Sequence, residues 1–488
     1  MMHRVLSLIL FLTFLAIATG CTIMGPDYRR PDTGIQVPKS FQHAQGKVVT
    51  PWPGDDWWRV FSDPELDLLV EEVLKNNLDI KKTAARILEI RSQLVQTRAD
   101  RFPRLSFQGR AQRQRQTIEL AMLTPQGITQ QQRRTTIDTH SLSLPASFEL
   151  DLWGRLARAE ESVLADLFQA EENRRTAAQT VVAESINLYL QTEALERRLQ
   201  IAEQSIENYR RSLALVESRY ERGLTTILDV RQARRTLARA GAFLPTLRQD
   251  LGSVQQKLAV LLGRYPKTRA PRAQPEDYFK RLVPVPPGLP SDLLLRRPDI
   301  RAAEARLQAL NARVGVAKAS RFPQITLTGN LGYSSEELNE LFTPQSKWWN
   351  LAMGIVQPLF DAGRLKAGQR AAEARYEQGV AEYAKTVLTA FSEAENALLT
   401  RREQLERRDR VLSFVKEARA TQQVAEGRYK RGLVDYLTVL EAQQTRFQAE
   451  ENLVLVDLAL LSNRVSLHRA LGGGWAAPEP VSSGRPKK

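Results

Sequence analysis

Few side chains in this chain of 488 residues are suited to catalysis or metal binding. It has one cysteine and four histidines: Cys21, His3, His43, His140 and His468. A zinc site needs several converging ligands, and these residues are scattered along the chain. The sequence also contains no Gly-x-Ser-x-Gly, no His-Glu-x-x-His and no P-loop. We therefore expect no enzyme activity, no metal site and no cofactor.

The single cysteine follows an expected export signal at residues 1–20. The signal has a basic residue, Arg4, and then an apolar run at 5–17 that is too short for a comfortable bilayer span. It ends in Ala18-Thr19-Gly20-Cys21, which is similar to a bacterial lipobox, although lipoboxes usually have leucine where Ala18 stands. We expect Cys21 to be lipidated and to become the mature N-terminus, which leaves no disulfide within the chain.

The chain is basic, with a formal net charge of +15. Proteins that bind nucleic acid concentrate such charge in a patch or stripe. Here the basic residues are spread along the sequence, which is typical of solvated helix surfaces rich in arginine and glutamate. We therefore expect no nucleic-acid partner, and the export signal supports the same conclusion.

Two halves of the chain are similar. Several short motifs recur 220 or 209 residues later: Asp79-Ile80, Ala85-Arg86 and Arg101-Phe102-Pro103 at the first offset, and Gly154-Arg155-Leu156, Arg219-Tyr220, Arg222-Gly223-Leu224 and Leu262-Gly263 at the second. Constant offsets over so many positions indicate an internal duplication. The expected segments are a lipidated extended segment at 21–62, a first repeat at 63–272, a linker at 273–290, a second repeat at 291–472 and a disordered tail at 473–488.

Each half predicts the same order of elements. A helix, at about 79–100 or 299–319, ends at Arg-Phe-Pro because proline disfavours helix in the residue before it. A β-hairpin follows, at about 104–150 or 323–360, and then two long helices that a glycine turn joins. Residues 155–222 contain no Gly or Pro, so this helix alone would extend about 100 Å, which indicates a helical bundle or tube.

Parts of both hairpins alternate apolar and polar residues, as half-buried strands do. The pattern is clear at 140–151, at 325–331 and at 349–355, and weaker at 104–114. The Gln- and Arg-rich stretch at 110–134 is expected to be an external loop. After residue 21 the sequence has no apolar run of about 18 residues, so if the exported chain crosses a membrane, it must do so with its strands.

Two hairpins give four strands per chain, and a small barrel needs about eight to close. Because lipid does not tolerate open sheet edges, other copies must complete the sheet. Three copies of four strands would give a trimeric 12-stranded β-barrel, which is a reasonable size for an outer-membrane barrel. The sequence thus predicts an α+β membrane protein in which this barrel continues into a long α-helical barrel.

Three motifs resemble those of the TolC/OprM-type outer-membrane efflux lipoproteins, the outer membrane factor family of tripartite efflux systems. They are Gly25-Pro26-Asp27-Tyr28-Arg29-Arg30-Pro31, Asp151-Leu152-Trp153-Gly154-Arg155 and the segment from Arg428 to Gln443, and the resemblance covers roughly 21–475. It implies a passive exit duct for drugs or other small molecules, anchored by its lipid and spanning the outer membrane by its barrel, with a tunnel in the periplasm. Its partners would be two further copies of the chain, a periplasmic adaptor (membrane fusion) protein, an inner-membrane pump of the resistance-nodulation-division (RND) class and outer-membrane lipid.

The resemblance also implies functional residues. The periplasmic gate, where acidic side chains and an apolar ring narrow the family's tunnel, matches Asp229, Leu437 and Glu441. Three copies of one carboxylate around an axis would repel each other and attract cations. Thr438 replaces an acid of the TolC branch, so we expect a less acidic ring here. Adaptor docking is expected at the two helix turns, formed by Arg222, Gly223, Leu224 and by Arg431, Gly432, Leu433.

Two alternatives remain open at this point. A type I secretion duct would have the same architecture, and the neighbouring genes would distinguish it from an efflux duct. A structural envelope lipoprotein would explain the long helices and the lipid. It would not explain four amphipathic strands placed at equivalent positions in both halves.

Overall fold

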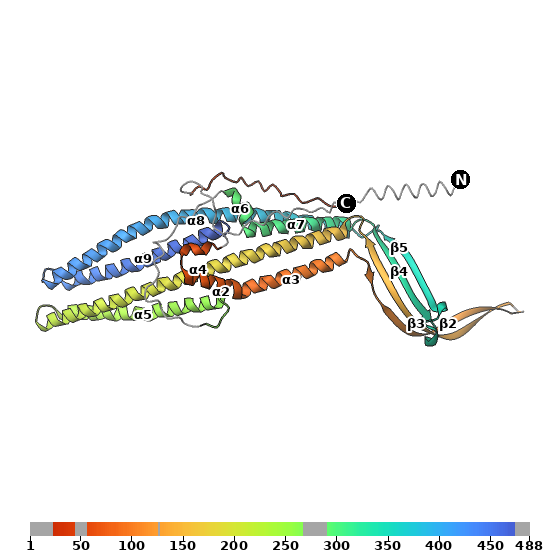
Figure 1. The fold of residues 1–488 in the computed structure, drawn as a ribbon, viewed down its shortest axis with the longest axis horizontal. Helices are drawn as coiled ribbons and strands as arrows, with labels where there is room; N and C mark the ends of the chain where they lie inside the picture. Colours follow the sequence, from red (N-terminus) through yellow and green to blue (C-terminus); the bar gives the residue numbers. More distant parts are fainter. Residues whose placement is uncertain (1–22, 44–55, 125–126, 267–289, 474–488) are drawn as a thin grey trace. The chain divides into compact units, whose positions relative to one another are not determined.

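The computed structural model describes residues 23–43, 56–124, 127–266 and 290–473 (Figure 1). Cys21, the signal at 1–20 and nearly all of the expected linker and tail therefore lie outside the described residues. The chain divides into two compact units. Unit 1 comprises residues 1–31, 88–168 and 304–381, and unit 2 comprises residues 32–87, 169–303 and 382–488. Each unit takes segments from both halves of the chain.

Unit 1 contains an antiparallel sheet. Its strands are β1 (Arg104–Leu105), β2 (Gln108–Thr124), β3 (Gly127–Leu150), β4 (Gln324–Ser335) and β5 (Lys347–Val356). β3 pairs on one edge with β1 and β2 and on the other with β4, which in turn pairs with β5. β1 and β2 pair with β3 in one continuous register and so act as a single interrupted strand. Counted in this way, the described sheet is four-stranded.

The expectation of an external loop at 110–134 is wrong. Residues 108–124 and 127–150 are paired strands, with Gln108 opposite Ser143 at one end and Thr124 opposite Gly127 at the other. Runs of Gln and Arg are compatible with paired strands, because hydrogen bonds between the strands pair the backbone N–H and C=O groups and polar side chains can remain in solvent. The composition indicated exposure correctly at Arg110, Arg113 and Arg115, which are exposed strand residues.

The predicted alternation gives the sheet an apolar face and an opposite face that is more polar. Phe148, Leu327 and Met353 form one row across β3, β4 and β5, and Leu144, Leu331 and Trp349 form a second row on the same face. The intervening row of Pro145, Asn330 and Asn350 lies on the opposite face. The apolar side chains of β5 are more than half exposed: Trp349, Leu351, Met353 and Ile355. The chain therefore leaves much of its apolar sheet face uncovered.

Two long helical hairpins supply most of unit 2 (Figure 1). α4 (Arg155–Glu221) and α5 (Ile227–Leu261) form hairpin 1, and α8 (Arg364–Lys430) and α9 (Tyr436–Ala470) form hairpin 2. α4 and α8 have 67 residues each, and α5 and α9 have 35 each. Positions separated by 209 therefore occupy corresponding places in the two hairpins, as the sequence offset predicts. Among the described helices, we find none that is both long and apolar enough to cross a membrane.

The remaining helices are shorter than α4 and α8. They are η1 (Trp57–Phe61), α2 (Pro64–Asn76), α3 (Leu78–Ala99), α6 (Pro290–Arg296), α7 (Pro298–Ala319), η3 (Leu338–Glu340) and η4 (Pro344–Ser346). η1 and α2 pack on α4 and α9 through a core that includes Trp57, Phe61, Ile186 and Tyr189. Asp63 joins this core to the start of α2, because its carboxylate caps the helix and accepts a hydrogen bond of 2.6 Å from the Tyr189 hydroxyl.

The start of the described chain packs on the helices of unit 1. A Cβ added to Gly25 would lie only 2.5 Å from the Gly315 Cα, so the two backbones can meet only where both residues lack a side chain. Arg158 of α4, whose side chain is almost fully buried, donates to Asp27 at 2.8 Å. These contacts hold the segment that follows the expected lipid attachment site against α4 and α7.

Candidate functional site

The turns at the ends of the two hairpins have the same backbone geometry. Gly223 and Gly432 have φ values of +70° and +75°, a conformation that favours glycine. The next amides, those of Leu224 and Leu433, donate back to the carbonyls of Arg219 and Arg428 at 2.9 and 3.0 Å. These bonds satisfy carbonyls that a helix end leaves unpaired. Each glycine therefore ends a helix and reverses the chain.

All six predicted docking residues lie at these turns. Leu224 and Leu433 are 59% and 60% exposed. Their basic neighbours fold back onto the preceding helix: Arg222 bonds the Ser218 hydroxyl, and Arg431 donates to the Gly427 carbonyl at 3.2 Å. Each turn therefore presents an uncovered leucine with a positive charge beside it.

The predicted gate residues have different environments. Asp229 is half-buried, and its carboxylate accepts hydrogen bonds from the hydroxyls of Thr225 and Thr226 at 2.5 and 3.0 Å. With Thr226 it forms a capping box at the start of α5. Asp229 therefore has a structural task in addition to any electrostatic one.

Leu437 and Glu441 lie one turn apart near the start of α9. Leu437 is 45% exposed, and Glu441 is also exposed. Within the described residues, the Glu441 side chain makes no hydrogen bond or ion pair. Its carboxylate is thus free to act on the surroundings of the helix, whereas that of Asp229 is engaged.

A contact that the sequence did not predict joins the hairpins near their turns. Arg219 of α4 places its Cζ 4.8 Å from the centroid of the Tyr429 ring on α8. It also donates to the carbonyls of Tyr429 and Lys430, at 3.2 and 3.4 Å, where α8 ends. A cation is stabilising both over an aromatic ring and at a helix C-terminus. The repeated Arg-Tyr pair at 219–220 and 428–429 was the available signal, but it does not reveal which arginine meets which tyrosine.

An apolar cluster backs this contact. It combines residues of all four long helices: Val216, Val230, Ala233, Ala425, Tyr429, Tyr436, Val439, Leu440 and Ala442. The rings of Tyr429 and Tyr436 are 5.7 Å apart, and burial raises the pKa of both hydroxyls. The two hairpins of one chain are therefore packed together near the turns.

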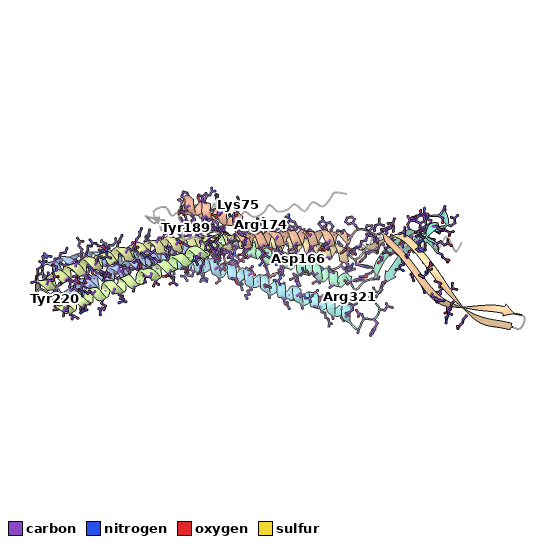
Figure 2. The ribbon with its side chains drawn as sticks, turned by 90° about the horizontal axis from the view of Figure 1, so that it is seen from below. Lys75, Asp166, Arg174, Tyr189, Tyr220 and Arg321 are labelled. Atoms are coloured by element: carbon purple, nitrogen blue, oxygen red, sulfur yellow. The ribbon has the colours of Figure 1, made fainter. Side chains whose placement is uncertain are left out.

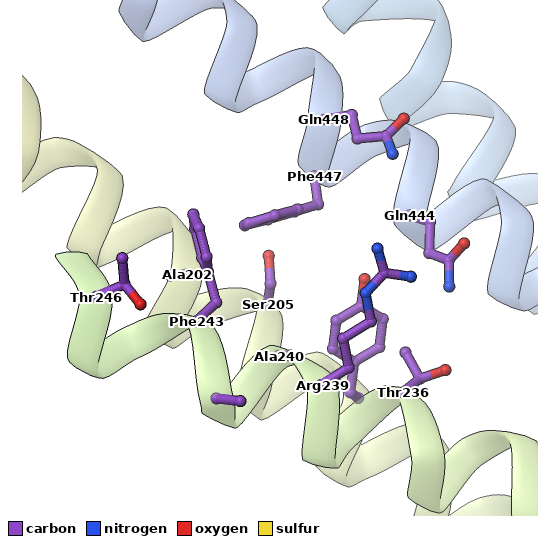
Figure 3. A pocket seen from close by; sticks show the side chains of 12 residues that line it. Ala202, Ser205, Thr236, Arg239, Ala240, Phe243, Thr246, Gln444, Phe447 and Gln448 are labelled. Carbon is purple, nitrogen blue, oxygen red and sulfur yellow. The ribbon is translucent and has the colours of Figure 1, made fainter.

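Farther from the turns, α4, α5 and α9 line a cavity of about 450 Å³ that is partly open to solvent (Figure 3). Phe243 of α5 and Phe447 of α9 meet edge to face across it, with centroids 6.2 Å apart. Ser205 and Thr246 line its hairpin 1 side, and Gln444 lines its hairpin 2 side. No group of metal-binding side chains was found among the residues that the structure describes.

Comparison with known proteins decides the family. The model of the family described as "Outer membrane efflux protein" matches residues 69–264 and 289–473. The chain belongs to the outer membrane efflux protein family. As an outer membrane efflux protein, it is a channel of the outer membrane, and the members of its family are transporters rather than enzymes.

Named relatives cover nearly the whole efflux protein. It is 35% identical over 454 residues to the pyoverdine export outer membrane protein OpmQ of Pseudomonas putida, covering 92% of this chain and 95% of the relative. It is 33% identical over 460 residues to the cation efflux system protein CusC of Escherichia coli O6:H1, covering 94% and 96%. The solved outer-membrane channel OprN has a TM-score of 0.84 and 31% identity, covering 92% of this chain and 99% of that one. These similarities support the efflux duct and do not favour the secretion duct or the structural lipoprotein.

Proposed function

We propose that three copies of this efflux protein form one passive channel, with a 12-stranded barrel in the outer membrane and an α-helical barrel in the periplasm. The sheet carries the proposal. Its apolar rows are exposed, as a lipid-facing surface would be, and β2 and β5 form its outer edges. Joining β5 of each copy to the β1–β2 line of the next would leave no open edge in lipid. The two sequence repeats, at 63–272 and 291–472, would supply one β-hairpin and one helical hairpin each.

The channel works as the exit duct of a tripartite pump, together with a periplasmic adaptor and an inner-membrane pump of the RND class. The turns support the adaptor contact, because each exposes a leucine, Leu224 or Leu433, beside an arginine. OpmQ and CusC are named for cargoes as different as pyoverdine and cations, although this chain is about equally similar to both. Such variety supports a duct that conducts whatever its pump delivers.

The periplasmic gate lies near the turns, with Asp229, Leu437 and Glu441 as its residues. The contact of Arg219 with Tyr429 supports this placement, since it holds two hairpins together close to where the tunnel would narrow. Opening would require the hairpins to separate at this end. Lipid on Cys21 would hold the mature N-terminus at the membrane.

Single-channel conductance tests the proposal. Purified protein in a planar bilayer should give discrete conductance steps, small at rest if the gate is closed. Thr326 and Thr328 of β4 lie on the polar sheet face, which would line the lumen, and Leu327 lies on the apolar face. A charged thiol-reactive reagent should block the channel of the Thr328→Cys variant, whose thiol would face the lumen. The Leu327→Cys variant should continue to conduct. Equal block at both positions, or no conductance from intact protein, would contradict the proposal.

A further inference from the structure

We propose that Arg428 binds the end of α4 in the next copy of the chain, as Arg219 binds the end of α8 within one chain. The inference rests on the three-copy assembly proposed above and specifies one contact that closes it. It follows from comparing positions 209 residues apart in hairpins 1 and 2.

The contact within the chain defines what the second contact requires. Arg219 lies over Tyr429 and donates to the last carbonyls of α8. Its counterpart at the 209 offset is Arg428, and the counterpart of Tyr429 is Tyr220. Arg428 is exposed, and its side chain makes no hydrogen bond or ion pair within the described residues. Of these two arginines, the chain therefore uses Arg219 for a contact between its own hairpins and leaves Arg428 available to bind another copy.

The receiving surface is uncovered on hairpin 1 and covered on hairpin 2. Tyr429 is 4% exposed. Tyr220, which lies at the end of α4 (Figure 2), is 44% exposed. Tyr436 is 2% exposed, whereas its counterpart Ile227 is 50% exposed. Hairpin 1 covers the tyrosines of hairpin 2 within the chain. A second hairpin 2 would cover Tyr220 and Ile227 in the same way, and only another copy of the chain can provide it.

Charge favours this second contact. The residue that ends α8, Lys430, is positive, so it repels the Arg219 that caps it. The counterpart that ends α4 is Glu221, which is exposed and would attract Arg428. Farther along, Arg197 of α4 lies 3.8 Å from Asp457 of α9. At the 209 offset, Arg197 corresponds to Glu406 and Asp457 corresponds to Arg248. These counterparts are again one acidic and one basic residue, so they too would attract each other in the proposed contact.

Side-chain size is complementary as well. Within the chain, Phe447 lines the cavity of Figure 3 from hairpin 2, and Ser205 and Thr246 line it from hairpin 1 beside Phe243. The counterpart of Phe447 is the small Ala238, and the counterparts of Ser205 and Thr246 are the larger Phe414 and Leu455. Phe414 and Leu455 are both 45% exposed in the single chain. Within the chain one large residue thus lies across from two small ones, and in the proposed contact two large residues would lie across from one small one. The sizes are exchanged between the two sides, so the open faces of hairpins 1 and 2 suit each other.

Paired cysteines test the contact in the full-length protein purified from membranes in mild detergent. Tyr220→Cys combined with Arg428→Cys should react with a short bismaleimide to give covalent dimers and trimers on a denaturing gel. Phe414→Cys combined with Ala238→Cys should do the same and avoids any effect of losing Arg428. The matched control is Tyr220→Cys with Leu412→Cys, because Leu412 is also exposed on α8 but lies about 24 Å from Arg428 along the helix. The control and each single variant should remain monomeric on the gel.

The native mass of each sample distinguishes a failure of the three-copy assembly from a failure of the Arg428 contact alone. Three chains by native mass with both test pairs linked between copies is the expected result. Three chains with neither pair linked, or with the control linked equally well, would overturn the inference and leave the three-copy channel intact. A native mass of one chain would overturn the assembly and this contact together.

Discussion

Arg219 of α4 and Tyr429 of α8 form the contact that joins the two hairpins of one chain beside their turns. The guanidinium lies over the ring, 4.8 Å from its centroid, and it also caps the end of α8. The Tyr429 side chain is itself almost fully buried in the cluster behind this contact. Separation of the hairpins would therefore break both the cation–π contact and the helix cap that the Arg219 side chain makes.

Removal of this contact should open the channel at its periplasmic end. Arg219→Ala loses interactions worth about 1–2 kcal/mol, which shifts a two-state gate toward its open form roughly tenfold. Mean conductance in planar bilayers should rise accordingly. Arg222→Ala removes a nearby arginine that bonds only its own helix, so its conductance should match the unmodified protein. An unchanged conductance in Arg219→Ala would argue against a gate at this contact.

Glu441 and Asp229 should differ in what their neutralisation changes. Glu441→Gln removes a free carboxylate, so the preference of the channel for cations over anions should fall without loss of stability. Asp229→Asn weakens the capping box with Thr226 and should lower stability by about 0.5–1 kcal/mol, with a smaller change in selectivity. Reversal potentials in a salt gradient and thermal unfolding measure the two effects. Equal selectivity changes would show that the engaged carboxylate still faces the lumen.

The exposed leucines of the turns should control binding of the adaptor. Leu224→Asp and Leu433→Asp should each weaken that binding about tenfold, or about 1.4 kcal/mol, because they replace apolar contact with a charge. Folding should be unaffected, since both side chains are exposed. Val260→Asp is the control, because Val260 is 64% exposed on α5 but lies far from its turn. Binding of the purified adaptor to immobilised channel distinguishes the variants, and equal losses in all three would reject the turns as the docking site.

His468 should make the protein sensitive to acid. It is 3% exposed and stacks on Trp57, and burial, together with Arg464 and Arg401, lowers its pKa to about 3. The unfolded chain binds this proton near pH 6.5, so stability is complete above that value and falls as the pH drops toward 3. Between pH 8 and pH 5 the loss should be about 2 kcal/mol.

His468→Leu should remove most of this dependence, measured by denaturant unfolding at several pH values. His140→Leu on β3 is the matched control and should retain the acid sensitivity of the unmodified protein. A pH profile that is the same in His468→Leu as in the unmodified chain would assign the acid sensitivity to other groups.

The order of elements was predictable because its signals are local. Absence of Gly and Pro predicted α4 at 155–222, and it spans Arg155–Glu221. Glycines between the long helices predicted the turns, and Gly223 and Gly432 have the positive φ values that such turns require. Alternation predicted the clear strands for the same reason, since it reports directly which side chains share a face.

Predictions failed or were missing where the determining interactions are not local. Residues 110–124 and 127–134 are strand because β2 and β3 pair through their backbones, whereas the Gln and Arg residues of this sequence show no alternating pattern. The partner of Arg219 lies 210 residues away on another helix, and the Arg-Tyr motif that recurs 209 residues later offers two arginines and two tyrosines for the pairing. Only the packing of hairpin 1 on hairpin 2 decides which pair forms within the chain.

The most direct test of the three-copy channel is its native mass in mild detergent, measured by light scattering with the detergent contribution subtracted. A mass of three chains is expected, because the sheet of one copy leaves edges that only further copies can pair in lipid. A stable single chain extracted from outer membranes would contradict it.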